Sequence, residues 1–153
     1  MAKLCKYADV ILPNISEASF MTGMPYPGEN ASNECIKDLL LSLAKLGSKK
    51  IVITGVESAD HKFGFMGYDS ETKEFFEYYT PKVQMKSHGT GDVFASTFTG
   101  ALMNDYNIQD SLKIAADFTK ACINNTYNDP EAVNYAVNFE SEIPYLLKLI
   151  RKV

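Results

Sequence analysis

Four consecutive residues near the middle of the chain, Gly89-Thr90-Gly91-Asp92, have types and an order that suit anion chemistry. Two glycines allow a tight turn and a close approach of the backbone to a ligand. Residues 93–102 have the composition of a helix, so the turn is expected at a helix N-terminus, where free N–H groups and the helix dipole favour an anion. Asp92 would lie in the first helical turn, beside that anion. The pattern predicts phosphoryl transfer; the alternative is an ordinary glycine turn in which Thr90 or Asp92 caps the helix.

The elements before this turn alternate in character. An apolar run over residues 8–12, ended by Pro13, predicts a buried parallel strand. A helix is predicted over 16–22 with Gly23 as its stop, and a stronger one over 31–46. The β-branched run Ile51-Val52-Ile53-Thr54 predicts a second buried strand. Strand, helix and strand in this order form a βαβ unit, so the sheet is expected to be at least partly parallel.

The later elements change in type. Two aromatic-rich runs, 63–68 and 74–79, flank a polar segment and predict an antiparallel hairpin whose aromatic side chains pack on the sheet. Three helices are predicted after it, over about 93–102, 108–124 and 141–151, with a polar irregular stretch over 125–139. A chain of 153 residues suits one domain, so we expect a single α/β domain over 1–153.

Bulk composition excludes several classes of protein. The net charge of −4 argues against general binding to nucleic acid or to anionic membranes. There is no apolar segment long enough for a transmembrane helix, and no secretory signal is visible. Cys5, Cys35 and Cys122 are odd in number and far apart, which supports neither a disulfide framework nor a zinc site. Three buried or partly buried free thiols in a reducing cytoplasm are the interpretation we favour.

Polar residues follow the strands at positions where ligands bind in α/β folds. Asn14 and Glu17 follow the first strand, Thr54 is expected to end the second, and the glycine turn follows the hairpin. Ligands in such folds bind in a crevice at the carboxyl ends of strands, so all three could converge on one crevice. Taken alone, Asn14 with Glu17 is an ordinary helix cap and Thr54 an ordinary strand-end threonine. We expect no chemistry of His88 or His61.

The ordered set Pro13-Asn14-x-x-Glu17, Ile51-Val52-Ile53-Thr54-Gly55 and Gly89-Thr90-Gly91-Asp92-Val93-Phe94-Ala95 resembles the second half of the ribokinase-like (PfkB carbohydrate kinase) superfamily. Within it, the set is most similar to the bacterial pyridoxal and pyridoxamine kinases. Softer cues are Gly67-Tyr68-Asp69 and Val137-Asn138-Phe139-Glu140. The resemblance implies the C-terminal part of a three-layer α/β/α fold, with parallel strands, an antiparallel hairpin edge and helices at the C-terminal end. Since that family is about twice as long, we expect Met1 to be internal and the acceptor pocket to lie mostly in a preceding segment.

The resemblance also implies a role for each matched residue. Asp92 would be the base that takes the proton from a substrate hydroxymethyl group, and Gly89, Thr90 and Gly91 would form the anion hole for the transferred phosphate. Asn14 and Glu17 would order Mg²⁺ and its waters near the nucleotide phosphates. Thr54 and Gly55 would contact those phosphates, and Val83 would line the adenine side. The family uses ATP, Mg²⁺ and usually a monovalent cation, often K⁺, which implies a cytoplasmic, commonly homodimeric kinase of a B6 vitamer.

One departure and three alternatives accompany this resemblance. Many B6 kinases carry a hydroxyl residue two places before the Asn, where this chain has Leu12, so one metal or phosphate contact is in question. The alternatives are a sugar or nucleoside kinase, a hydroxymethylpyrimidine kinase, and a non-catalytic fragment. The pyrimidine kinases often carry Cys at the position of Asp92, which disfavours them here.

Overall fold

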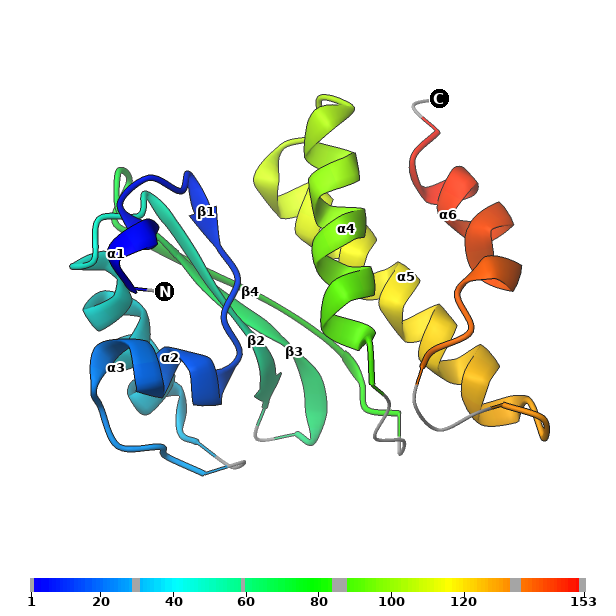
Figure 1. Ribbon diagram of the computed structural model, residues 1–153, viewed down its shortest axis with the longest axis horizontal. Helices are drawn as coiled ribbons and strands as arrows, with labels where there is room; N and C mark the ends of the chain where they lie inside the picture. The colour runs from blue at the N-terminus through cyan, green and yellow to red at the C-terminus, as the bar shows by residue number, and fades with distance from the viewer. Residues whose placement is uncertain (1, 29–30, 59, 84–87, 133–135, 152–153) are drawn as a thin grey trace. The chain divides into compact units, whose positions relative to one another are not determined.

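A computed structural model describes residues 2–28, 31–58, 60–83, 88–132 and 136–151. The chain divides into two compact units, Met1–Lys82 and Val83–Val153, and each is described by itself. The first unit contains all the strands assigned in the described residues, and the second contains helices (Figure 1). The single domain expected over 1–153 stays a prediction.

The first unit is a four-stranded sheet with helices. Its elements, in chain order, are α1 (Ala2–Cys5), β1 (Val10–Ile11), α2 (Ile15–Thr22), α3 (Asn33–Ala44), β2 (Lys50–Glu57), β3 (Lys62–Asp69) and β4 (Glu74–Pro81). The strand order is β1-β2-β3-β4. β1 pairs with β2 in parallel, as the βαβ pattern predicts, and the β2–β3 and β3–β4 pairs are antiparallel. The hairpin predicted from the aromatic runs is therefore confirmed as β3 and β4.

The two strands of the βαβ unit differ from their predicted extents. β1 is two residues long and half-buried, so the buried strand predicted over 8–12 is wrong in length and burial. The reason is its place at the end of the strand order, where it has one strand neighbour instead of two. β2 is longer than predicted and continues past Thr54 to Glu57, because its pairing with β3 continues there.

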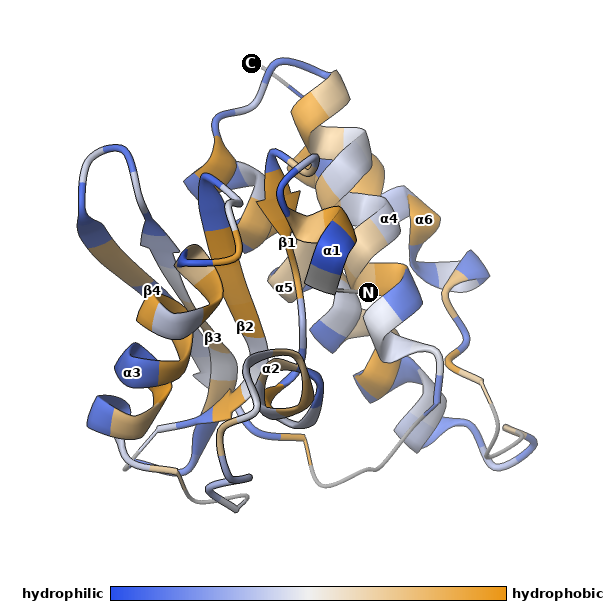
Figure 2. Ribbon diagram, turned by 60° about the vertical axis from the view of Figure 1, so that its left-hand side comes forward, coloured by the Kyte–Doolittle hydropathy of each residue, from blue (hydrophilic) through white to orange (hydrophobic). Residues whose placement is uncertain are grey.

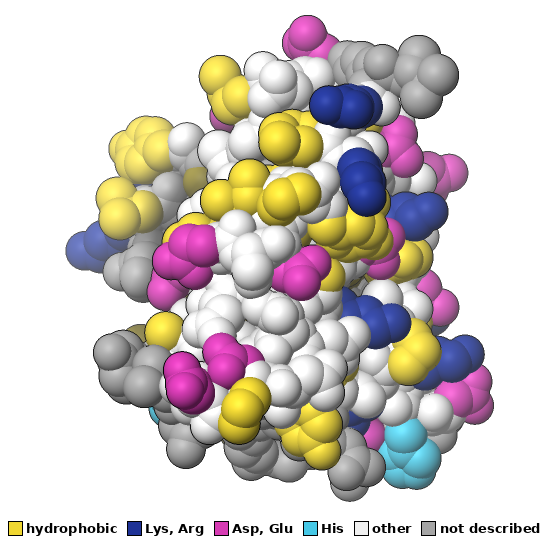
Figure 3. All heavy atoms as spheres, turned by 90° about the vertical axis from the view of Figure 1, so that its right-hand side faces the viewer, with side chains coloured by type: hydrophobic (Ala, Val, Ile, Leu, Met, Phe, Trp, Pro, Cys, Tyr) yellow, Lys and Arg dark blue, Asp and Glu magenta, His cyan; other side chains and the backbone are white. Residues whose placement is uncertain are grey.

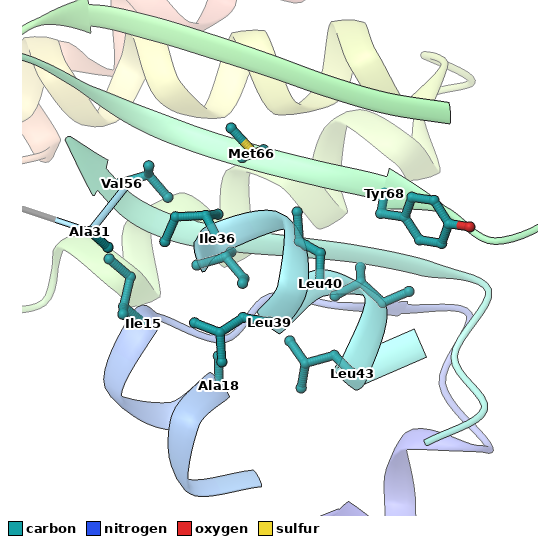
Figure 4. Close-up of a cluster of buried hydrophobic side chains, with 12 residues drawn as sticks. Ile15, Ala18, Ala31, Ile36, Leu39, Leu40, Leu43, Val56, Met66 and Tyr68 are labelled. Carbon is teal, nitrogen blue, oxygen red and sulfur yellow. The ribbon is translucent and has the colours of Figure 1, made fainter. Parts of the chain in front are cut away.

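The core of the first unit lies between α2, α3 and the sheet. Ser32 caps α3 by accepting a hydrogen bond from the Cys35 N–H, and the helix then presents one apolar stripe, composed of Ile36, Leu39, Leu40 and Leu43, all at most 1% exposed. Figure 4 shows this stripe meeting Ala18 of α2 and the strand residues Val56, Met66 and Tyr68. Figure 2 shows that β2, which faces this core, is hydrophobic along most of its length. The stripe fixes α2 and α3 against β2, and so fixes the residues at the start of α2.

The second unit consists of α4 (Thr90–Met103), α5 (Ile108–Asn128), the 3₁₀ helix η1 (Glu140–Glu142) and α6 (Ile143–Leu149). Asn107 caps α5 by accepting from the Asp110 N–H. α5 extends to Asn128, so the irregular stretch predicted from 125 begins later than expected. Figure 3 views the side of Figure 1 on which α6 is drawn, where hydrophobic and charged side chains of both signs are interspersed. No helix in the described parts of the chain is both long and apolar enough to cross a membrane.

Candidate active site

Asn14 and Glu17 occupy the start of α2 and hold each other there. The Asn14 side chain accepts a hydrogen bond from the Glu17 N–H at 2.9 Å, and Glu17 Oε2 accepts from the Asn14 N–H at 2.9 Å. This is a capping box, in which two otherwise unpaired N–H groups are satisfied reciprocally. Both residues are exposed. The local interpretation of this pair as a helix cap is therefore confirmed, and the cap also fixes an amide and a carboxylate side by side at the surface.

Thr54 lies beside Asn14. The two residues form a parallel bridge, and the Thr54 N–H donates to the Pro13 carbonyl oxygen at 2.9 Å. The structure thus brings together three of the predicted site residues, Asn14, Glu17 and Thr54. The prediction that Thr54 ends its strand is wrong. It is the last residue of β2 paired on the β1 side, while the β3 side of β2 continues to Glu57.

Gly55 explains how β2 continues. Its φ is +75°, and the register between β2 and β3 shifts between Thr54 and Val56. An extra residue in the left-handed region is a β-bulge of the kind that favours glycine. A side chain here would meet no clash, since the nearest atom to an added Cβ is the Phe63 ring at 3.7 Å, so the backbone conformation is what requires glycine. The bulge leaves the Thr54–Gly55 backbone half-exposed next to Asn14.

A groove of about 640 Å³ opens beside the Asn14 cap. Its lining is almost entirely apolar and includes Leu12, Pro13, Phe20 and Met21, with Glu17 as its charged member. Leu12 is half-buried in this wall. The position at which many B6 kinases carry a hydroxyl residue is therefore an apolar wall position here. Glu17, which is exposed, is the charged residue among those that line this groove.

The glycine turn forms the start of α4, as predicted. Gly89 is the N-cap residue with φ +82° and no side-chain cap, which excludes the alternative in which Thr90 or Asp92 caps the helix. An added Cβ at Gly89 or Gly91 would have no atom within 4 Å, so the backbone faces open space. Asp92 is exposed in the first turn. An uncapped helix start with exposed backbone has free N–H groups that favour an anion.

Two positions near the predicted site carry contacts that the sequence did not indicate. Glu57 accepts hydrogen bonds from Lys82 and from His61, and these two bonds, Lys82 first, hold the pKa of the Glu57 carboxyl below its usual value. The pair fixes Lys82 next to Val83, which is half-buried. Glu57 and Lys82 are far apart in sequence and belong to no motif, so spacing gave no signal for them. His88 is exposed.

The second missed position is Val93, directly after Asp92. It packs against a buried cluster of Phe118, Cys122 and Val137 within the second unit. Its burial is typical of an ordinary core valine, so only the three-dimensional contact reveals that the start of α4 depends on the late part of the chain. The convergence of this turn with Asn14, Glu17 and Thr54 stays a prediction.

The donor atoms present suit a hydrated hard cation better than a metal cage. No cluster of three or more His, Cys, Asp or Glu that could hold a metal occurs among the described residues. Mg²⁺ usually keeps several waters and takes one or two carboxylates together with substrate phosphates. In the capping box one carboxylate oxygen of Glu17, Oε2, accepts from the Asn14 N–H. A single exposed carboxylate beside an amide fits a water-mediated Mg²⁺ contact.

The cysteines are free, as predicted. Cys5 and Cys122 are buried, but Cys35 is exposed, so its predicted burial is wrong; it lies on α3 outside the buried stripe of that helix. Burial raises the pKa of the Cys122 thiol to about 12, with a smaller contribution from the nearby Glu142 charge. A thiol held protonated is a poor nucleophile and a poor metal ligand, so Cys122 serves packing.

Comparison with known proteins gives a consistent picture. Among curated relatives, the chain is 29% identical over 136 residues to a hydroxymethylpyrimidine/phosphomethylpyrimidine kinase of Haemophilus influenzae, which covers 82% of this chain and 46% of that protein. It is 28% identical over 129 residues to a pyridoxine kinase of Bacillus subtilis, which covers 82% of this chain and 45% of that protein. The chain therefore spans about half the length of these relatives.

A solved structure confirms the fold and the superfamily. A Bacteroides thetaiotaomicron protein that carries the provisional name phosphomethylpyrimidine kinase, crystallised with pyridoxal, matches with a TM-score of 0.84 at 27% identity. The match covers 99% of this chain and 52% of that one. The predicted α/β class and the ribokinase-like resemblance with B6-kinase similarity are confirmed. Residues 1–137 match the family described as phosphomethylpyrimidine kinase, and the chain belongs to that family.

Proposed function

We propose that this chain carries the nucleotide-binding and catalytic side of an ATP-dependent kinase that phosphorylates the hydroxymethyl group of a B6 vitamer. The observation that supports this most is the uncapped, glycine-opened start of α4 with Asp92 in its first turn. Family membership makes phosphoryl transfer the chemistry to which that geometry is assigned. Such transfer passes through a loose transition state and needs mainly positioning and charge neutralisation.

Asp92 accepts the hydroxyl proton of the acceptor in this proposal. A carboxylate in the first turn of a helix lies where the helix dipole favours negative charge. A weak but well-placed base is adequate when the proton leaves late. The N–H groups of the Gly89–Gly91 turn hold the oxygens of the transferred phosphoryl group, and the missing side chains at Gly89 and Gly91 leave room for it.

In this proposal the nucleotide binds to residues of the first unit and to Val83, which directly follows it in the chain. Thr54 and the bulged Gly55 contact the nucleotide phosphates, and Val83 lines the adenine side. Glu17 and Asn14 would hold Mg²⁺ through waters, and the ion would supply neutralisation of phosphate charge. The contacts of Asn14 with Glu17 and with Thr54 support placing the roles of these three residues in one area.

A hydroxymethylpyrimidine is the second candidate acceptor. The matched family and the H. influenzae relative are named for pyrimidine substrates, whereas the B. subtilis relative is named for pyridoxine. Both acceptors are flat nitrogen heterocycles with a hydroxymethyl group, so the same base and anion hole serve either. Asp92 in place of the Cys frequent in pyrimidine kinases favours the B6 vitamer.

Several further properties stay predictions. We expect the chain by itself to bind ATP weakly and to have little kinase activity, since it spans about half the length of its curated relatives. A single domain, a K⁺ requirement, a homodimer and a cytoplasmic location belong to the same proposal.

A coupled ADP-release assay tests the proposed function. The complete product of the reading frame is assayed with ATP, Mg²⁺ and, in separate reactions, pyridoxal, pyridoxamine, hydroxymethylpyrimidine and ribose. Turnover with pyridoxal or pyridoxamine above that with the others supports the proposal. Turnover with hydroxymethylpyrimidine alone would identify the second candidate as the acceptor. The absence of ADP release with every one of these acceptors would overturn the proposal.

A further inference from the structure

The start of α4 is anchored in the interior of the second unit through Val93. Gly89, Gly91 and Asp92 are exposed, and Gly89 makes no side-chain cap. Val93 is the residue of this turn that packs on the buried cluster of the unit. Among the described residues of the cluster, Phe118 and Cys122 come from helix α5, and Val137 comes from the segment before η1. The wall against which Val93 rests is therefore partly made by a non-helical segment.

The position of Val137 is set by the neighbouring residue, Asn138. The Asn138 N–H donates to Thr126 Oγ1 at 2.8 Å, and the Thr126 hydroxyl donates to the Cys122 carbonyl oxygen at 2.7 Å. Thr126 is 1% exposed, and Val137 is 5% exposed. One buried hydroxyl thus joins the backbone of the 137–138 segment to α5, one helical turn from Cys122. We call this connection through Cys122, Thr126 and Asn138 the Thr126 link.

The outer contacts of the same segment are more accessible. Asn138 Nδ2 donates to Asp129 Oδ2 at 2.8 Å, and Asn125 Nδ2 donates to Ser141 Oγ at 2.6 Å. Partly exposed bonds of this kind exchange readily with bonds to water, whereas the loss of a buried partner leaves the remaining group unsatisfied. The Thr126 link is consequently the contact whose removal most changes the position of Val137.

We propose that Thr126 is a positioning residue for the Gly89–Asp92 turn, acting through Asn138, Val137 and Val93. The link holds Val137 on α5, Val137 completes the wall under Val93, and Val93 fixes the first turn of α4, in which Asp92 stands. The catalytic meaning of this coupling rests on the proposed function, because misplacement of an anion hole or base by about 1 Å costs up to about 100-fold in rate. The coupling itself is independent of catalysis and is tested without it.

Hydrogen–deuterium exchange of the chain tests the coupling, with Thr126→Val, Thr126→Ser and the unchanged protein compared. Valine keeps the shape of threonine but removes both hydrogen bonds. The first hydrogen-bonded amides of α4 are those of 93–96, beginning with the Val93 N–H that donates to the Gly89 carbonyl oxygen. These amides and those of 136–139 should exchange roughly two- to tenfold faster, the range expected when opening costs one net hydrogen bond less. The first half of α5, over 108–118, should be unchanged. Serine retains the hydroxyl and should restore the exchange of 93–96. A matched control, Leu112→Val, alters a fully buried residue at the other end of α5 and should leave 93–96 unchanged.

Faster exchange of 136–139 with unchanged exchange of 93–96 would overturn the proposal, as would equal acceleration by Thr126→Val and Thr126→Ser. If Thr126→Val does not fold, Val137→Ala tests the next step of the same chain of contacts. That variant should accelerate 93–96 and leave 108–118 unchanged, and normal exchange of 93–96 in it refutes the coupling. Selective acceleration of 93–96 supports the coupling even where the complete product shows no kinase activity, so the two proposals fail separately.

Discussion

Variants of the capping box at the start of α2 can distinguish the structural role of Glu17 from its proposed role in binding Mg²⁺. Glu17 Oε2 accepts from the Asn14 N–H at 2.9 Å, and a glutamine oxygen at the same position can accept the same bond. Glu17→Gln should therefore keep the box and lose only the attraction between the carboxylate and the helix dipole, about 0.3–1 kcal/mol. Glu17→Ala removes the acceptor as well, for about 0.5–1.5 kcal/mol more. Asn14→Ala removes the N-cap itself and should cost about 1 kcal/mol.

Two measurements on these variants give the comparison. Urea unfolding of the chain should rank the loss of unfolding free energy as small for Glu17→Gln and larger for Glu17→Ala and Asn14→Ala. In the Mg²⁺ dependence of ADP release by the complete product, the two Glu17 variants should instead be equally impaired, because both lack the charge. Glu17→Gln with the Mg²⁺ dependence of the unchanged protein would refute the metal role. Equal destabilisation by Glu17→Gln and Glu17→Ala would refute the hydrogen-bonding argument.

Three further predictions concern the scaffold. Gly64→Ala should lower the free energy of unfolding by about 3 kcal/mol or more, since an added Cβ would lie 1.9 Å from the Tyr78 carbonyl oxygen. Gly91→Ala, whose added Cβ has no atom within 4 Å, should keep the melting temperature of the unchanged protein. Equal melting temperatures of the two variants would contradict this prediction. A thiol reagent should modify the exposed Cys35 rapidly and the buried Cys5 and Cys122 only on unfolding, so rapid modification of all three would count against the described burial. The hydrogen bond from Lys50 lowers the pKa of the Asp69 carboxyl. The stability that this bond contributes is complete above the unfolded pKa of about 4 and is lost as pH falls through the lower folded pKa. When unfolding is measured against pH, Asp69→Asn should flatten this acid-side loss of stability, and an unchanged slope would refute the prediction.

Local sequence patterns were sufficient for much of the fold. The Ile and Leu spacing of α3 repeats with the helical period and is bounded by Ser32, so its predicted extent differs from the observed one by two residues at each end. The hairpin of β3 and β4 follows from two aromatic runs around a polar turn. The i, i+3 spacing of Asn14 and Glu17 predicts the cap that the structure contains.

The errors arise where a distant partner decides the conformation. A glycine after Thr54 looks like the end of a strand, but the antiparallel partner β3 carries β2 through a bulge at Gly55. The asparagines near the end of α5 look like a loop, but Thr126 is buried and bonded to the segment at Asn138. Both partners, β3 and Asn138, lie outside the short stretch of sequence over which a periodic hydrophobic pattern can be recognised.

The candidate site was predictable only where its contacts join residues close in sequence or follow from the parallel pairing of the two strands of the βαβ unit. Asn14 next to Thr54 follows from two strands of one βαβ unit, because parallel neighbours bring their carboxyl ends to the same edge. The Glu57–Lys82 pair and the contact of Val93 with Val137 join residues that no motif relates. These are the contacts that hold the flanks of the predicted site in place.

The most direct test of the kinase proposal is the effect of Asp92→Asn on turnover. Asparagine keeps the size of the side chain at this exposed position and removes its ability to accept a proton. In the complete product of the reading frame, ADP release with pyridoxal should fall by roughly 10²- to 10⁴-fold, with little change in the KM for ATP. Turnover close to that of the unchanged protein would show that Asp92 is not the base and that the Gly89–Asp92 turn does not catalyse phosphoryl transfer in the way proposed.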